Sequence, residues 1–276
     1  MTENFQELYN PENAPEWNEE KTMEHASGIW GRDPMLQYLR DEVIKPGDKV
    51  LDIGSGAGYP SARMAEMVGK DGTVVGLEYS KSMLGIADDE KGEPASKKYE
   101  ALKQLMFING DATNMPIQEK SFDVATSFMV LHNLELPQVQ KVLQETARVL
   151  KPGGKAVFLT MHPDMLESDW KLDFMEYPDD AIAAYKALEE KEGFRLSGKV
   201  KNAGGGEKQI GLVVHTRENM QQAIAQAGLE LAHEEGYFID ADTAAEKFGE
   251  NASRVMPTTP TFWKLELVKP ESTEAS

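Results

Sequence analysis

Hydrophobic residues follow two different spacings along most of this chain. Short apolar runs at 50–53, 73–78, 105–108, 122–132 and 156–160 are flanked by Gly, Pro, Asn or Asp, which is typical of buried strands. Around them, apolar residues recur at helical spacing in 25–43, 60–69, 99–104 and 139–150. Strands that alternate with helices predict an α/β fold.

The C-terminal part of the chain shows further elements. Residues 194–201 and 209–216 have the pattern of two strands joined by a run of glycines. A helix is predicted from Thr216, which can cap it, to Gly228, and strands are predicted at 229–238 and 262–268. No internal repeat or Pro-, Gly- or Ser-rich linker divides the sequence, so we expect a single domain.

The first predicted strand leads into a glycine-rich turn. Gly54, Gly56 and Gly58 stand at alternate positions, where backbone must approach a ligand closely or adopt positive φ. Dinucleotide-binding turns follow G-x-G-x-x-G, but here Tyr59 stands at the position of the third glycine. Asp52 would repel a pyrophosphate and attract a cationic amino or sulfonium group.

Polar residues also stand where the next strands end. Glu78 lies twenty residues beyond Gly58, where an acid can accept hydrogen bonds from ribose hydroxyls. Asp111 follows the third strand and is placed to accept a hydrogen bond from an adenine amine. His132 follows the fourth strand, and an imidazole with an unperturbed pKa of about 6.5 can act as a general base.

Several of these motifs occur in one order. Asp52–Gly58, Glu78, Gly110–Ala112, Phe122–Val124 and Arg148–Gly154 together resemble the class I S-adenosylmethionine (SAM)-dependent methyltransferases, in particular the group that acts on small molecules. The resemblance covers about residues 45–160. It implies a doubly wound, mostly parallel seven-stranded sheet with an antiparallel last strand, plus a lid insertion.

The resemblance also implies a cofactor and an activity. SAM would be the cofactor, and its methyl group would pass to an O, N, S or C atom of a small-molecule substrate by in-line displacement. The backbone near Ser127 and Phe128 would face the amino-acid end of SAM. The residues implied to contact the cofactor are Asp52, Gly54, Ser55, Gly56, Gly58, Glu78, Tyr79, Asp111, Ala112, Ser127 and Phe128.

Segments outside the resembling core are candidates for the acceptor site. We expect an N-terminal cap at 1–44, a SAM-binding core at 45–161, a lid insertion at 162–215 and the C-terminal part of the sheet at 216–269. Aromatic walls would exclude water and favour a cationic sulfonium group. The predicted acceptor contacts are Tyr9, Trp17, His25, Trp30, Trp170 and Tyr177.

Composition narrows the classes of partner. A formal net charge of −18 argues against binding to nucleic acid and to anionic membrane surfaces. The absence of cysteine excludes disulfides and thiolate metal sites, and the five histidines lack the spacing of a metal-binding helix. We therefore expect that the protein needs no metal. The N-terminus lacks the features of a signal peptide, so we expect a cytoplasmic protein.

Two alternative functions remain open from the sequence. A protein of the same fold can bind SAM or a partner without catalysis, because fold alone does not give function. Aminopropyl transfer from decarboxylated SAM uses a similar turn, but a polyamine acceptor would call for a second acidic cluster after the fourth strand. His132 and Asn133 stand there instead. The acceptor and the oligomeric state are left open.

Overall fold

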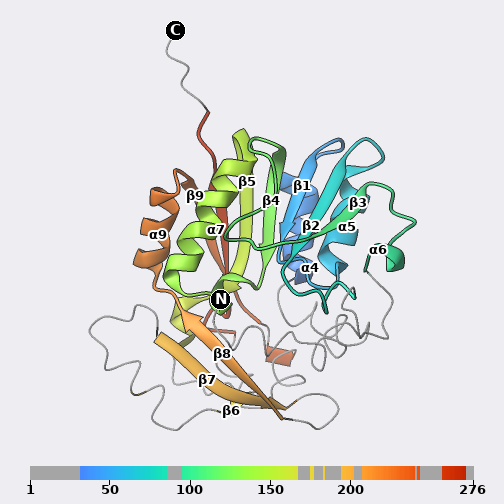
Figure 1. Ribbon diagram of the computed structural model, residues 1–276. Helices are drawn as coiled ribbons and strands as arrows, with labels where there is room; N and C mark the ends of the chain where they lie inside the picture. The colour runs from blue at the N-terminus through green and yellow to red at the C-terminus, as the bar shows by residue number, and fades with distance from the viewer. Residues whose placement is uncertain are drawn as a thin grey trace.

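The described residues of the computed structural model are 32–85, 95–166, 175–176, 183, 194–201, 207–239, 241–242 and 257–271. They build one large and one small β-sheet (Figure 1). The strands of the large sheet are β1 (Lys49–Ile53), β2 (Thr73–Glu78), β3 (Leu105–Asn109), β4 (Phe122–Phe128), β5 (Leu150–Met161), β9 (Glu230–Tyr237) and β10 (Phe262–Val268). The strands of the small sheet are β6 (Met175–Glu176), β7 (Phe194–Lys201) and β8 (Glu207–Val214).

The large sheet has seven strands in the order β3-β2-β1-β4-β5-β10-β9. All pairs from β3 to β5 are parallel, whereas β10 runs antiparallel to both β5 and β9. The chain moves outward from β1 in one direction to β2 and β3 and later in the other direction to β4 and β5. This reversal between β1 and β4 is where doubly wound folds bind ligands, at the carboxyl ends of the strands. The predicted fold class is confirmed.

Helices cover both faces of this sheet (Figure 1). The α-helices are α4 (Arg32–Tyr38), α5 (Tyr59–Val68), α6 (Ala95–Lys98), α7 (Leu136–Val149) and α9 (Arg217–Gln226). The described residues also form the π-helix η1 (Leu39–Val43) and the 3-10 helices η2 (Leu131–Asn133) and η3 (Pro163–Leu166). Because side chains alternate along a strand, Val50 packs with α4 and α5 while Leu51 packs with α7 and α9.

Local sequence explains where the main helices begin and end. Pro60 stands in the first turn of α5, which ends at Gly69 with φ +65°. A capping box between Glu135 and Gln138 begins α7, and the Thr216 hydroxyl caps α9 by accepting a hydrogen bond from a backbone N–H. These predicted helices are confirmed.

The helix predicted at 99–104 is wrong. The chain forms α6 four residues earlier, and Tyr99 begins a series of tight turns that lead into β3. The Leu102 N–H donates to the Tyr99 carbonyl at 2.9 Å, and the Leu105 N–H donates to the Leu102 carbonyl at 2.9 Å. The Tyr99 ring packs against Phe107, so its burial comes from a tertiary contact rather than from a helix face.

Part of the predicted insertion forms the small sheet. Strand β7 has the predicted bounds, while β8 begins two residues before the predicted 209. The small sheet lies below the large one in Figure 1, and its strand β8 contacts η2, the turn that follows β4. The predicted acceptor contacts lie outside the described residues: Tyr9, Trp17, His25, Trp30, Trp170 and Tyr177. The boundaries of cap and lid therefore stay a prediction.

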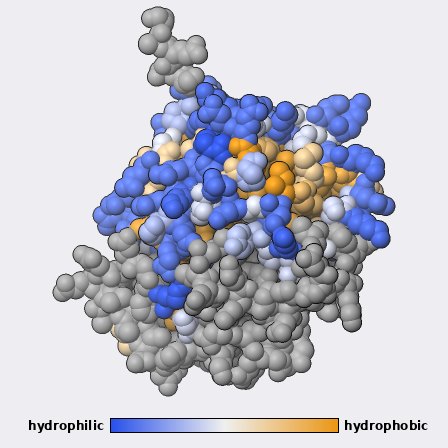
Figure 2. All heavy atoms as spheres, viewed as in Figure 1, coloured by the Kyte–Doolittle hydropathy of each residue, from blue (hydrophilic) through white to orange (hydrophobic). Residues whose placement is uncertain are grey.

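The surface in the same view has hydrophilic and hydrophobic areas. Hydrophilic residues cover α7 and α9, and hydrophobic residues gather beside α7, over the middle strands (Figure 2). Within the described ranges, no helix has both the length and the apolar character to cross a membrane.

Candidate functional site

The turn after β1 requires glycines both for their backbone conformation and for close packing. Gly54 and Gly58 have φ of +74° and +88°, which is unfavourable for other L-residues. A Cβ at Gly54 would lie 2.3 Å from a Val130 methyl carbon, and one at Gly58 would lie 2.4 Å from the Phe107 ring. The turn is held against β2, since the Gly54 N–H donates to the Leu77 carbonyl at 2.8 Å. At these two positions the missing side chains make room for the protein's own residues.

Glu78 joins this turn to the end of β2. Its carboxylate accepts hydrogen bonds from the Gly56 N–H at 2.9 Å and the Ser80 N–H at 2.8 Å. Burial raises the pKa of Glu78, and these backbone bonds act in the opposite direction. A carboxylate offers about four acceptor positions, and the Tyr79 N–H also bonds to this one, so the group retains capacity for a ligand hydroxyl. The Asn109 amide fixes the same corner by donating to the carbonyls of Glu78 and Tyr79.

Asp52 is directed into the protein. Its carboxylate accepts hydrogen bonds from the Ser61 hydroxyl at 2.6 Å and the Thr126 hydroxyl at 3.2 Å, and only 1% of the residue is exposed. These bonds tie β1 to α5 and β4. The neighbouring Ser127 hydroxyl donates to the Ile53 carbonyl at 3.0 Å and fixes the ends of β1 and β4 together. The predicted role of Asp52 toward the amino-acid end of SAM stays a prediction.

The remaining predicted cofactor residues lie at the same edge. Asp111 follows β3 and accepts hydrogen bonds from the Thr113 N–H and hydroxyl, both at 2.8 Å, which forms a local turn. The Ser55 hydroxyl is buried against β2 and finds no hydrogen-bond partner among the described residues. The structure therefore brings together, at or next to the carboxyl ends of four strands, Asp52, Gly54, Ser55, Gly56, Gly58, Glu78, Tyr79, Asp111, Ala112, Ser127 and Phe128.

His132 lies in η2, just beyond the end of β4. The residue is 8% exposed, and its Nδ1 atom has no hydrogen-bond partner within the described part of the chain. Burial, with a smaller contribution from His215, lowers the pKa of His132 to about 3. The assumption of an ordinary imidazole pKa of about 6.5 is therefore wrong. Its role as a base stays a prediction, but the ring is neutral at physiological pH.

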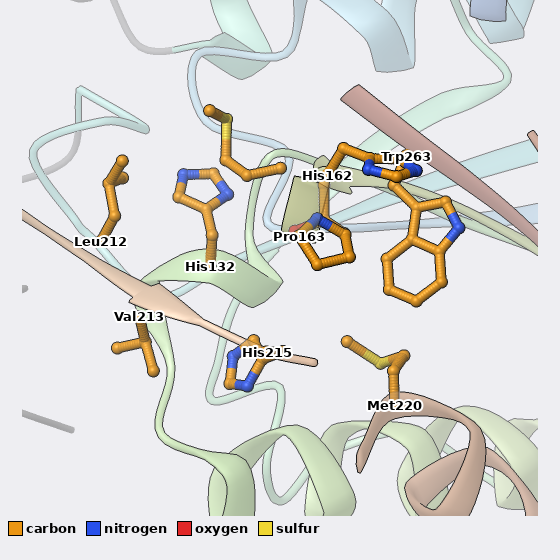
Figure 3. A pocket seen from close by; sticks show the side chains of 10 residues that line it. His132, His162, Pro163, Leu212, Val213, His215, Met220 and Trp263 are labelled. Carbon is orange, nitrogen blue, oxygen red and sulfur yellow. The ribbon is translucent and has the colours of Figure 1, made fainter. Parts of the chain in front are cut away.

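A cavity lies beside His132 (Figure 3). Its enclosed volume is about 20 Å³, and it spans about 400 Å³ when the part open to solvent is included. The end of β5, the end of β8, α9 and the start of β10 form its walls together with η2. The lining residues are His132, Thr160, Met161, His162, Pro163, Leu212, Val213, His215, Met220 and Trp263.

Sequence reasoning missed this cavity. The histidines lack the spacing of a metal-binding helix in the sequence, whereas the fold brings His132, His162 and His215 to one hollow. A usable signal was present, because His132 and His215 each stand at the end of a predicted strand. In the described ranges, no group of three or more metal-ligating side chains is arranged to hold an ion.

Comparisons with known proteins agree with this fold. Residues 51–158 match the family described as "Methyltransferase domain". Two curated relatives are demethylmenaquinone methyltransferases, one from Oceanobacillus iheyensis (36% identical, 50% of this chain and 53% of the relative) and one from Bacillus cereus (38% identical, 47% and 52%). The chain thus spans about half the length of the curated relatives that it matches.

Solved structures extend the likeness over nearly the whole chain. A protein from Pyrococcus horikoshii matches with a TM-score of 0.59 at 17% identity, over 98% of this chain and 100% of that one. A SAM-dependent methyltransferase from Aquifex aeolicus matches with a TM-score of 0.56 at 15% identity, over 95% and 99%. At such identities the likeness shows the fold. Together with the domain match, it confirms the resemblance to class I methyltransferases.

Proposed function

Since this chain has the fold and the matching domain of the class I SAM-dependent methyltransferases, we propose that it transfers the methyl group of SAM to a small-molecule acceptor. One observation carries the proposal. The buried Glu78 carboxylate is joined to the glycine-rich turn through the Gly56 N–H, at the point where the strand order reverses. A cytoplasmic location, expected from the lack of cysteine and of signal-peptide features, belongs to the same proposal.

The residues at this edge fit the parts of SAM. Glu78 has acceptor capacity for a ribose hydroxyl, and Asp111 stands one strand further on, where the adenine amine would lie. The turn after Asp52, with Ser127 and Phe128 at the end of β4, would hold the amino-acid end. The adjacent hollow beside His132 supports an acceptor site on the side of β5.

The protein's own residues contribute position and a dry environment. When bound, SAM supplies an electrophilic methyl group. The neutral His132 ring can take the acceptor's proton while the acceptor forms its bond to the methyl carbon, because that proton becomes strongly acidic at this stage. The buried position of His132 is consistent with a site that limits access of water.

We further propose that residues 1–44 and 162–215 close over the acceptor. Strand β8 of the second segment supplies Leu212 and Val213 to the cavity wall, which supports this arrangement. The aromatic and imidazole side chains proposed to complete the site are those of Tyr9, Trp17, His25, Trp30, Trp170 and Tyr177.

Calorimetry with SAM and with its demethylated product, S-adenosylhomocysteine (SAH), tests the cofactor. Binding of both is expected, and no binding of either at high micromolar concentration would reject the proposal. Transfer of label from methyl-labelled SAM into a metabolite extract tests catalysis. SAM binding without any labelled product would favour the non-catalytic alternative, and turnover with decarboxylated SAM would favour aminopropyl transfer.

A further inference from the structure

The cavity beside η2 has polar atoms that the fold does not use. The His132 Nδ1 and Thr160 Oγ1 atoms are both buried and have no hydrogen-bond partner within the described residues. A buried polar atom left unpaired costs about 1–3 kcal/mol, so native proteins rarely keep two in one place. Both residues line the same hollow, which indicates that a ligand group pairs with them.

We propose that this cavity binds a hydroxyl group of an apolar acceptor, with His132 Nδ1 and Thr160 Oγ1 as its two hydrogen-bonding partners. The inference rests on the proposed function and names its class of substrate. A hydroxyl both donates and accepts, so it can donate to an unprotonated Nδ1 and accept from the Thr160 hydroxyl. The enclosed volume of about 20 Å³ has room for one such oxygen.

The rest of the wall defines the body of the acceptor. Apolar side chains of the β5 exit, β8 and α9 form most of it, which suits an apolar molecule with a single polar end (Figure 3). No described lining residue carries a carboxylate, and the titratable groups that face His132 across the hollow are other histidines. The nearby Arg217 is paired with Glu234. The nearest described carboxylates, Asp164 and Glu234, lie behind His162 and face Arg217. An ammonium group beside His132 would thus lack a direct counter-charge, which makes an amine acceptor unfavourable.

His215 is a positioning residue for His132. Its Nε2 lies 3.0 Å from the Leu131 carbonyl oxygen, so Nε2 must be the donor of this bond. Leu131 begins η2, the turn that carries His132. The small sheet therefore fixes the imidazole through the backbone, although β8 and η2 are distant in sequence.

Phenol, toluene and benzylamine are suitable probes because they share a ring and differ in one group. We expect NMR titration of the full chain saturated with SAH to give phenol an affinity about 3–10-fold above that of toluene, with a shift of the His132 imidazole signals. Thr160→Val should remove most of this preference. Thr146→Val is the matched control, since its hydroxyl is buried in α7 and donates to the Val142 carbonyl; it should leave the preference unchanged.

Two further variants test the positioning role. His215→Leu should shift the free His132 imidazole signals and weaken phenol binding, whereas His215→Gln, which keeps an N–H donor, should restore both in part. Equal affinity for phenol and toluene, tighter binding of benzylamine, or an unchanged preference in Thr160→Val would overturn the inference. A titration with SAH alone, followed by the phenol titration of the SAH-bound protein, separates the two proposals. Failure of SAH to bind rejects the methyltransferase function, while SAH binding without a phenol preference rejects only the hydroxyl site.

Discussion

The two polar regions at the carboxyl edge of the sheet differ in how their buried groups are paired. At the ends of β1 and β2, Asp52 and Glu78 accept hydrogen bonds from neighbouring hydroxyl or backbone groups. At the cavity near β5, His132 Nδ1 and Thr160 Oγ1 have no partner among the described residues. Most buried groups of the first region are paired by folding, with the Ser55 hydroxyl as an exception, whereas we propose that a ligand pairs the groups of the second region.

The difference suits two tasks within one site, cofactor binding and acceptor binding. A cofactor shared by a whole family can be held by a rigid corner that the core itself stabilises, and the bonds of Glu78 to two backbone amides build such a corner. An acceptor that differs between proteins is better bound by polar side chains that have no hydrogen-bond partner within the protein. We therefore expect mutations in the first region to affect folding and cofactor affinity, and those in the second to affect acceptor choice.

The largest expected effect lies in the glycine-rich turn. Gly54→Ala adds a Cβ at φ +74°, 2.3 Å from Val130, and should lower the free energy of unfolding by about 2–5 kcal/mol. Gly69→Ala is the control, since its φ is +65° but nothing lies within 4 Å; a loss of about 1–2 kcal/mol is expected. Urea unfolding measures both. Equal losses would mean that packing against Val130 is unimportant.

Removal of the proposed ribose acceptor comes next. Glu78→Ala should weaken SAM binding by about 2–4 kcal/mol, because it deletes a charged acceptor for a ribose hydroxyl and releases the Gly56 N–H. Calorimetry measures this loss, and Glu66→Ala on the exposed side of α5 should leave the affinity unchanged. An unaltered affinity in Glu78→Ala would place the ribose elsewhere.

The low pKa of His132 makes the cavity region sensitive to acid. Below pH 6.5 the unfolded chain binds a proton at this residue, but the folded protein does not until the pH approaches 3. The free energy of unfolding should therefore fall as pH falls through this window, by about 2 kcal/mol at pH 5. Urea unfolding at pH 7 and pH 5 should show this loss in the wild type and a smaller one in His132→Asn. Identical pH dependence in both proteins would mean that His132 is protonated more easily than its burial indicates.

The smallest effects come from deleting one hydroxyl in each region. Ser127→Ala removes a bond to the Ile53 carbonyl and should cost about 1 kcal/mol of stability. Thr160→Val removes a hydroxyl that has no partner in the described structure, so stability should stay the same or rise by about 1 kcal/mol. Thermal unfolding of the two variants compares them directly. A larger loss in Thr160→Val than in Ser127→Ala would contradict the difference drawn between the regions.

The sequence predicted best those features that depend on residues close together in the chain. The bounds of β2 and β10 were predicted to the residue, because continuous apolar runs there end at turns or polar residues. Glu78 was singled out from its distance to the glycine-rich turn; it does bond to that turn through the Gly56 N–H, and its role toward the ribose stays a prediction. The helix predicted at 99–104 failed because Tyr99 and Leu102 pack in turns that only the position of Phe107 explains.

The cavity escaped prediction for a different reason. Thr160, His215 and Trp263 come from separate elements, and no spacing relates them. The pKa of His132 likewise depends on burial by residues far away in sequence. Such properties arise from tertiary contacts, which a pattern of residue types does not encode.

The position of the small sheet has a consequence for how such proteins diversify. The insertion departs after Met161 and rejoins at His215, and both residues line the same hollow. The cost of closing a loop between neighbouring points grows slowly, by about 0.6 kcal/mol for each doubling of its length. Segments of very different length can thus be grafted between these two points while β5 keeps its register with β10. If the proposed function holds, we expect a chimaera that exchanges only this segment to change the wall of the hollow and to keep SAM binding.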